Sequence, residues 1–226
     1  MLQQHKNIRH VPTGSVIASA AFGAWVLYKF IPPGFALIAA IFPAGITLFE
    51  SVRAHYRKKA DVVAETDISV LWQAVNLGGL AIVAITYVSA YLTHRTFFTS
   101  GIVCVAVIGT VLWQSRRWLG ESYSAVPRVF PNHKLVAGGP YRLVRHPMYT
   151  YLIALLPALG LVFGAFRSPA TAAGALVGTI LFGTPLIKRA LLEEELLGAL
   201  PQTPETPRFI PTPRSLWRYL REPFLP

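Results

Sequence analysis

The stretch "ATAAGALVGTILFGTPLIKRALLEEELLGAL", residues 170–200, starts as an apolar run and ends in a cluster of charged side chains. No charged residue occurs between positions 170 and 187. A helix needs about 20 apolar residues to cross the hydrocarbon core of a bilayer. We therefore predict a membrane-spanning helix over residues 170–191, with its charged end at one membrane face.

Similar apolar runs recur along the chain, which is 53% hydrophobic and only 14% charged, with a mean hydropathy of +0.46. This composition is far from that of an average soluble domain. It predicts an all-α integral membrane protein with about six transmembrane helices, and at least five. The expected spans are residues 13–31, 34–50, 68–92, 100–119, 149–166 and 170–191.

The distribution of basic residues predicts the orientation of these helices. With the N-terminus in the cytosol, only three of the 21 lysines and arginines fall on the far side, which leaves 18 on the cytosolic side. Both termini and the loop over residues 120–148 are then expected in the cytosol. The net charge of +11 is scattered between apolar spans, so the lipid bilayer is favoured as a partner and no nucleic acid is expected.

Two further features bear on processing and redox chemistry. The first apolar stretch has no clear small-residue cleavage site and is followed at once by another, so it is expected to be a retained span rather than a signal peptide. Cys104 is the single cysteine, which excludes a disulfide framework and a cysteine metal site. No metal is predicted.

Small residues in the last two spans predict close helix packing. Gly160 and Gly164, and then Gly174 and Gly178, repeat at a spacing of four. Such faces can pack within one chain or form the seam of a homodimer, and the sequence leaves both open. Pro185 removes a backbone hydrogen bond inside the last span and is expected to bend or open that helix.

The segment "AGGPYRLVRHPMY", residues 137–149, concentrates polar chemistry next to the fifth span. Gly138 and Gly139 permit a tight turn, and Pro147 suits the first position of a helix. The unpaired N–H groups at that helix start, with Arg145 beside them, predict an anion site.

A second polar cluster, "KRALLEEELLGAL", closes the sixth span at residues 188–200. Arg189 and Glu193 are four residues apart and share a helix face. The run from Glu193 to Glu195 could receive a cation or an amine. It could also be a solvated helix end that balances nearby basic residues.

Together, "KLVAGGPYRLVRHPMY" and "RALLEEELL", about forty residues further on, resemble the isoprenylcysteine carboxyl methyltransferase (ICMT) family and its phospholipid methyltransferase relatives. These are multi-span membrane enzymes that use S-adenosylmethionine, and the resemblance covers roughly residues 131–211. It implies a catalytic role for Arg189 and Glu193. It also implies that the cofactor is bound by His133, Leu135, Gly139, Tyr141, Arg145, His146, Pro147, Tyr149, Glu193 and Glu194.

The resemblance divides a single membrane domain, residues 1–226, into three parts. Four spans occupy residues 1–119, and a cofactor-binding region with two spans occupies 120–211. The tail, 212–226, is predicted to form a short amphipathic helix at the cytosolic membrane surface, with Thr212 as N-cap and Pro213 as first helical residue.

The resemblance also implies the activity. The expected reaction is methyl transfer from S-adenosylmethionine to a lipophilic acceptor at the cytosolic face, with carboxyl O-methylation of a prenylcysteine or a small lipophilic acid favoured. The segment "LPQTPETPRFIP", residues 200–211, departs from relatives in lacking their spaced tyrosines, which leaves the acceptor open. Two alternatives are an NADPH-dependent sterol or steroid reductase of the membrane and a non-enzymatic membrane scaffold. The expected location is the endoplasmic reticulum membrane of a eukaryote or the plasma membrane of a bacterium.

Overall fold

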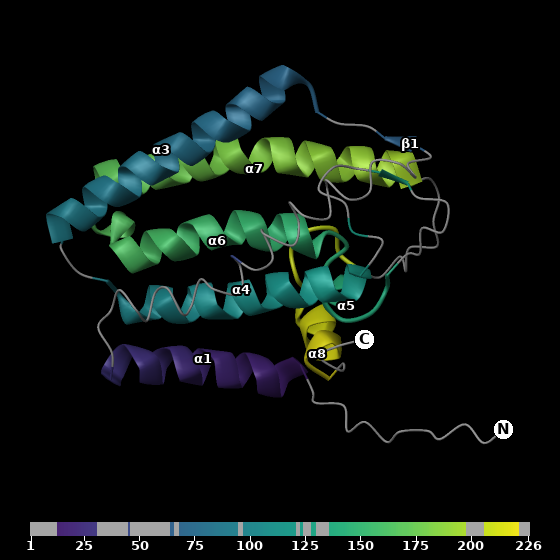
Figure 1. The fold of residues 1–226 in the computed structure, drawn as a ribbon, viewed down its shortest axis with the longest axis horizontal. Helices are drawn as coiled ribbons and strands as arrows, with labels where there is room; N and C mark the ends of the chain where they lie inside the picture. The colour runs from purple at the N-terminus through teal and green to yellow at the C-terminus, as the bar shows by residue number, and fades with distance from the viewer. Residues whose placement is uncertain are drawn as a thin grey trace.

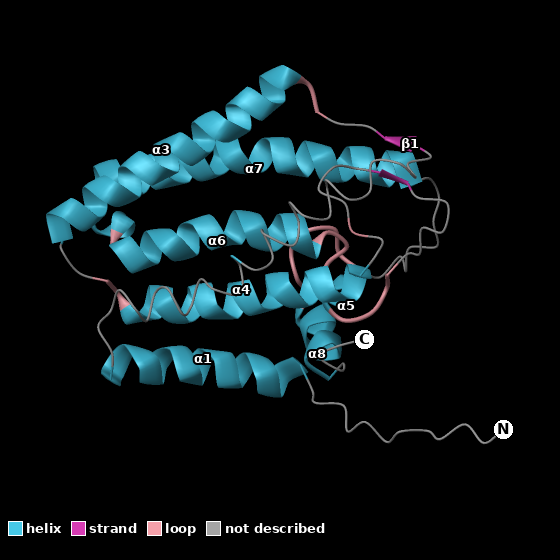
Figure 2. Cartoon of the chain, in the orientation of Figure 1, coloured by secondary structure: helices cyan, strands magenta, loops and turns pink. Residues whose placement is uncertain are grey.

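The computed structural model describes residues 13–30, 45, 64–65, 68–94, 97–120, 123, 128–129, 136–197 and 206–221. The described residues are mostly helical (Figure 2). The long helices are α1 (Thr13–Phe30), α3 (Val70–His94), α4 (Thr99–Leu119), α6 (Pro147–Phe163) and α7 (Pro169–Leu197). The short elements are α5 (Pro140–Leu143), the 3₁₀ turn η3 (Ala165–Arg167), α8 (Pro213–Arg221), and the antiparallel two-residue strands β1 (Ala64–Glu65) and β2 (Arg128–Val129).

Five of the six predicted spans correspond to observed helices, and the span predicted at 34–50 lies, except for Gly45, outside the described residues. α7 continues to Leu197, beyond the predicted end at 191, because the acidic cluster continues the helix. By length and composition, α3 and α7 are the described helices that could cross a membrane, whereas α6 is a shorter apolar helix. The all-helical class is therefore confirmed, and a count of six spans is not.

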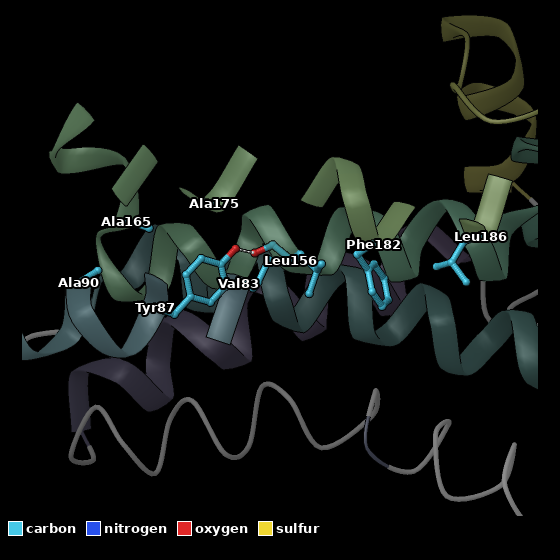
Figure 3. Close-up of a cluster of buried hydrophobic side chains, with 8 residues drawn as sticks. All are labelled: Val83, Tyr87, Ala90, Leu156, Ala165, Ala175, Phe182 and Leu186. Carbon is cyan, nitrogen blue, oxygen red and sulfur yellow. Dashed lines mark hydrogen bonds between the residues drawn. The ribbon is translucent and has the colours of Figure 1, made fainter. Parts of the chain in front are cut away.

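α1, α4, α6 and α7 lie side by side along a common direction, and α3 crosses them at an angle (Figure 1). α3 packs against α7, and α4 lies between α1 and α6. One buried cluster joins α4 to α6 and includes Ile102, Val105 and Val162. A second cluster joins α3, α6 and α7; in it, the hydroxyl of Tyr87 donates a hydrogen bond to the carbonyl of Leu156 (Figure 3).

The predicted small-residue faces are used for packing within the chain. A Cβ at Gly178 would lie 2.9 Å from the carbonyl oxygen of Gly79, and one at Gly174 would lie 2.5 Å from the Thr86 hydroxyl. Gly160 faces Tyr87, and Gly164 takes a positive φ of 71° as the C-cap of α6. The predicted close packing is confirmed inside one chain, and a homodimer through these faces is not supported.

Pro185 does not open α7, contrary to that alternative of the sequence prediction. The helix runs unbroken from Pro169 to Leu197, with Pro185 buried inside it. The side-chain amide of Asn76 donates a 2.7 Å hydrogen bond to the carbonyl of Phe182, one turn before the proline. This bond joins α3 to α7 next to Leu181, whose carbonyl has no helical partner because Pro185 lacks an N–H.

The outer surfaces of α3 and α7 are apolar. Only 22% of the most apolar window of α3 and 33% of that of α7 are buried, so neither is the buried core helix of a soluble domain. Large hydrophobic side chains such as Leu71, Ile85 and Ile180 are exposed on them. A shallow depression on the same face of α3, lined by residues such as Val88 and Leu92, is also apolar. These surfaces are consistent with a membrane protein.

Candidate functional site

One end of the bundle brings together segments that are far apart in the sequence. α4 and α7 end there, α5 and α6 begin there, and the residues before α8 cross it (Figure 1). The glycine-rich motif and the acidic cluster therefore meet at the same end, which we call the site end.

The glycine-rich motif forms a tight turn against Trp118. Gly139 has a positive φ of 53° and is the N-cap of α5, whose first residue is Pro140. A Cβ at Gly139 would lie 2.5 Å from the indole nitrogen of Trp118. Glycine is required there both for its backbone conformation and for this close approach. The predicted turn is confirmed, and Trp118 has a packing role.

The start of α6 also agrees with the sequence prediction. His146 is the N-cap and Pro147 the first helical residue, where its missing N–H is not needed. Val144 between α5 and α6 is extended, and the chain bends at the next residue, Arg145. The side chains of Arg145 and His146 contact the end of α7.

Glu194 contacts three basic side chains at this end. Its Oε1 lies 3.0 Å from Nε2 of His146 and 3.8 Å from Nη1 of Arg145. Its Oε2 lies 3.1 Å from Nη2 of Arg208. The Glu194 side chain is only 13% exposed, so these charge-assisted contacts act in a medium that screens them weakly.

A segment we call the strap, Thr206–Phe209, closes over the start of α6. The backbone N–H groups of Arg145 and His146 donate to the carbonyls of Pro207 and Arg208, at 2.9 and 3.3 Å. Nε of Arg145 donates to the carbonyl of Thr206 at 2.9 Å. The ring of Phe209 stacks on that of His146, with centroids 5.5 Å apart.

These contacts occupy the residues that directly precede α6. The chain itself supplies the negative groups, because the strap carbonyls accept the backbone donors and the Glu194 carboxylate faces Arg145 and His146.

Glu193 faces a group of tyrosines rather than the strap. Its carboxylate accepts a hydrogen bond from the hydroxyl of Tyr149 and acts on buried Tyr141 through its charge. Its Oε2 lies 4.0 Å from Nδ1 of His146. Arg189, one turn earlier on α7, places its positive charge near Tyr149. The predicted pair of Arg189 and Glu193 thus lies beside the tyrosines of the first motif.

The sequence reasoning did not select Arg116 and Tyr123, which complete the tyrosine group. The guanidinium carbon of Arg116 lies 4.4 Å from the ring centroid of Tyr123, and its Nη1 donates to the carbonyl of Gly120 at 2.8 Å. Within the described residues, the buried Nε–H of Arg116 has no hydrogen-bond partner. Arg208 was also not selected, although it lies in the segment over residues 200–211 that was quoted for its lack of tyrosines.

Two ionisable groups of the site end that lie outside the long apolar helices, His146 and Tyr141, have shifted pKa values. Burial lowers the pKa of His146, with Arg145 and Arg208 acting in the same direction, while contact with Glu194 opposes the shift. A neutral ring protonated on Nε2 can donate to Glu194. Burial raises the pKa of Tyr141 well above its ordinary value, and the charge of Glu193 adds to this, so the hydroxyl remains a donor.

The structure thus gathers most residues that the resemblance implied. Glu195 is exposed and stands apart from the cluster. His133 and Leu135 lie outside the described residues. The residues at the site end are Gly139, Tyr141, Arg145, His146, Pro147, Tyr149, Arg189, Glu193 and Glu194.

The protein has two helices of membrane-spanning length and a partly buried His–Arg–Glu–Tyr cluster at one end of a helical bundle. These are the features of a membrane protein with a polar site at one face. Residues 101–198 match the sequence model of the isoprenylcysteine carboxyl methyltransferase (ICMT) family. This match covers the two motifs up to the end of α7, so the resemblance drawn from them is confirmed over this region. The match extends from α4 to the end of α7 and implies a membrane methyltransferase. No curated protein matches the chain significantly.

Proposed function

We propose that this protein transfers the methyl group of S-adenosylmethionine to a lipophilic carboxylic acid, such as a prenylcysteine, at the membrane face where the site lies. The observation that carries the proposal is the contact between His146 and Glu194, at 3.0 Å, which joins the two motifs of the family. Glu193, Tyr141 and Tyr149 adjoin this contact.

The residues present suit the chemical groups of the cofactor. S-adenosylmethionine carries a sulfonium cation, an ammonium, a carboxylate and an aromatic base, and when bound it supplies a methyl group on a good leaving group. The Glu193 carboxylate and the faces of Tyr141 and Tyr149 can attract a cation. Arg189 and Arg116 can bind a carboxylate, and Arg116 has a buried donor with no partner in the described residues.

In this proposal, the chain acts mainly by positioning. Glu194 holds the start of α6 against the end of α7 through His146, and the strap shields that contact from water. Alignment of two reactants can contribute about 7–11 kcal/mol to catalysis. In the proposal a carboxylate acceptor needs no base: Arg189 holds its charge, and Arg116 binds the carboxylate of the cofactor. A hydroxyl or amine acceptor would need a base, for which Glu193 is the candidate.

The same proposal places the site end in the cytosol. Arg116 and Arg117 lie in the last turn of α4 at that end, whereas Lys29 and Arg167 lie at the opposite end of the bundle. This asymmetry agrees with the positive-inside rule. Labelling of a Ser124→Cys variant in sealed vesicles tests it, and labelling only from the non-cytosolic side would contradict it.

The membrane could be the endoplasmic reticulum of a eukaryote or the plasma membrane of a bacterium. In either case, the activity is tested with purified protein in nanodiscs. Calorimetry should show binding of S-adenosylmethionine and no binding of NADPH. Binding of NADPH alone would favour the reductase alternative, and binding of neither would favour a scaffold.

The acceptor is tested with N-acetyl-S-farnesylcysteine and a tritiated methyl donor. The product should be a base-labile methyl ester, and the matched carboxamide should accept no methyl group. A protein that binds the donor and methylates neither compound would retain the methyltransferase class and lose the proposed acceptor.

A further inference from the structure

α8 begins with a reciprocal cap. The backbone N–H of Ser215 donates to the Thr212 hydroxyl at 3.1 Å, and the N–H of Thr212 donates to the Ser215 hydroxyl at 2.9 Å. Pro213 is the first helical residue, as the sequence predicted. This arrangement is equivalent to a capping box and fixes the helix start directly after the strap.

One face of α8 is fastened to the bundle. Tyr219 is 1% exposed, and its hydroxyl donates to Oε1 of Gln114 on α4. Nε2 of Gln114 donates in turn to the hydroxyl of Thr13 on α1, at 3.2 Å. Ser215 and Tyr219 are the buried residues of α8. We call this buried chain of hydrogen bonds the clasp.

The opposite face of α8 is basic. Arg214, Arg218 and Arg221 recur at spacings of four and three and are exposed. Trp217 on the same side is 58% exposed, and the guanidinium carbon of Arg221 lies 4.1 Å from its ring centroid. Residues 206–221 contain four arginines and no acidic residue. Of these four, Arg208 is paired with Glu194 at the site.

The direction of α8 suits a membrane surface. It runs across the ends of α1 and α4 rather than along them (Figure 1). A helix that lies across the ends of membrane-spanning helices is parallel to the bilayer plane and at the depth of the headgroups. Arginine and tryptophan are the residues that bind phosphates and occupy this region.

We propose that the exposed face of α8 binds anionic lipid headgroups, and that this binding holds the strap on the site. Only three residues, 210–212, separate the strap from α8, so motion of α8 is transmitted to the hydrogen bonds made by Thr206–Phe209. Lipid that fixes α8 therefore keeps the strap carbonyls on Arg145 and His146. The second part rests on the proposed function, because the strap closes the donor site.

Hydrogen exchange tests the lipid contact without any activity. The full-length protein is placed in nanodiscs of phosphatidylcholine alone, or with 30% phosphatidylglycerol. We expect the amides of α8 and of the strap to exchange on the order of tenfold more slowly in the anionic discs. High salt should remove the difference, because it screens charges at the surface. Equal exchange in the two kinds of disc would overturn the proposal.

Two matched double variants identify the surface. R214Q/R221Q removes two charges from α8, whereas R117Q/K188Q removes two exposed charges at the same end of the bundle. The first should lose the response to anionic lipid, and the second should keep it. If R117Q/K188Q lost the response to anionic lipid, alone or together with R214Q/R221Q, the response would depend on the overall positive charge of this end and not on α8. Tyr219→Phe should loosen the strap even in anionic discs, since it breaks the clasp.

Calorimetry with S-adenosylmethionine then tests the link to the site. Anionic lipid should raise the donor affinity several-fold in the wild type and not in R214Q/R221Q. Slower exchange without any donor binding would keep the lipid site and reject the proposed function. Donor binding that does not change with lipid would limit the role of α8 to attachment. If anionic lipid had no effect and the exposed face of α8 instead bound a second copy of the chain or a nucleic acid, the assignment of lipid as its partner would be wrong.

Discussion

The two parts of α7 are held by different interactions, the first by close packing and the second by charged side chains. Up to Ile187, the helix packs on α3 through glycines and leaves apolar side chains exposed, and its backbone approaches that of Gly79 closely. After Lys188, the same helix makes its contacts through Arg189, Glu193 and Glu194. Tolerance to substitution should therefore depend on volume in the first part and on charge in the second.

The largest expected effect comes from added volume between α3 and α7. A Cβ at Gly79 would overlap the backbone nitrogen of Phe182 and lie 2.8 Å from the carbonyl of Gly178, so the helices must separate. Gly79→Ala should cost about 3 kcal/mol or more, or prevent folding. Its neighbour Gly78 has nothing within 4 Å, and Gly78→Ala should be neutral or slightly stabilising. Thermal unfolding in detergent measures both, and equal melting temperatures would contradict the packing.

The next effect concerns the charge of Glu194. Glu194→Gln keeps the shape but removes the charge that faces His146, Arg145 and Arg208. We expect a loss of about 2 kcal/mol in unfolding free energy, because cations are left without their partner. Donor affinity should fall at least tenfold. Glu195→Gln, at an exposed position on the same turn, is the control. Similar losses in both variants would mean that the acidic run acts as a whole.

The apolar and the polar part of α7 also differ in how much of their structure could be predicted from the sequence. The helices of the apolar part followed from hydropathy, and the turn at Gly139 and the start at Pro147 followed from the conformational preferences of these residues. The pairing of the two motifs needed the family resemblance, since spacing alone does not bring His146 to Glu194. The strap and Arg116 could not be found in this way, because their contacts involve backbone carbonyls and aromatic faces that carry no sequence signature.

The polar part should also respond to pH. Burial lowers the pKa of His146 from 6.5, so the unfolded chain binds more protons between the lowered value and pH 6.5. The contribution of this residue to stability is complete above pH 6.5 and is lost as the pH falls through the lowered pKa. The slope is at most about 1.4 kcal/mol per pH unit.

Unfolding measured from pH 7.5 to 5.5 checks this titration. His146→Gln should flatten the decline at acidic pH. His94→Gln changes a histidine at the opposite end of the bundle and should keep the wild-type slope. A decline that persists unchanged in His146→Gln would place the titrating group elsewhere.

The smallest expected effect is that of removing the aromatic contact between the strap and His146. The ring of Phe209 stacks on that of His146 at an interplanar angle of 28°, whereas the neighbouring Ile210 is 81% exposed. Phe209→Leu keeps an apolar side chain but removes the aromatic contact, which is worth about 0.5–1.5 kcal/mol. Without this contact the strap is held less firmly over the proposed donor site. We therefore expect donor affinity to fall by about two- to tenfold, with little change in melting temperature. Ile210→Val is the matched control and should leave donor affinity unchanged. Calorimetry that finds the same affinity in Phe209→Leu as in the wild type would show that the strap is held by its backbone bonds to Arg145 and His146 alone.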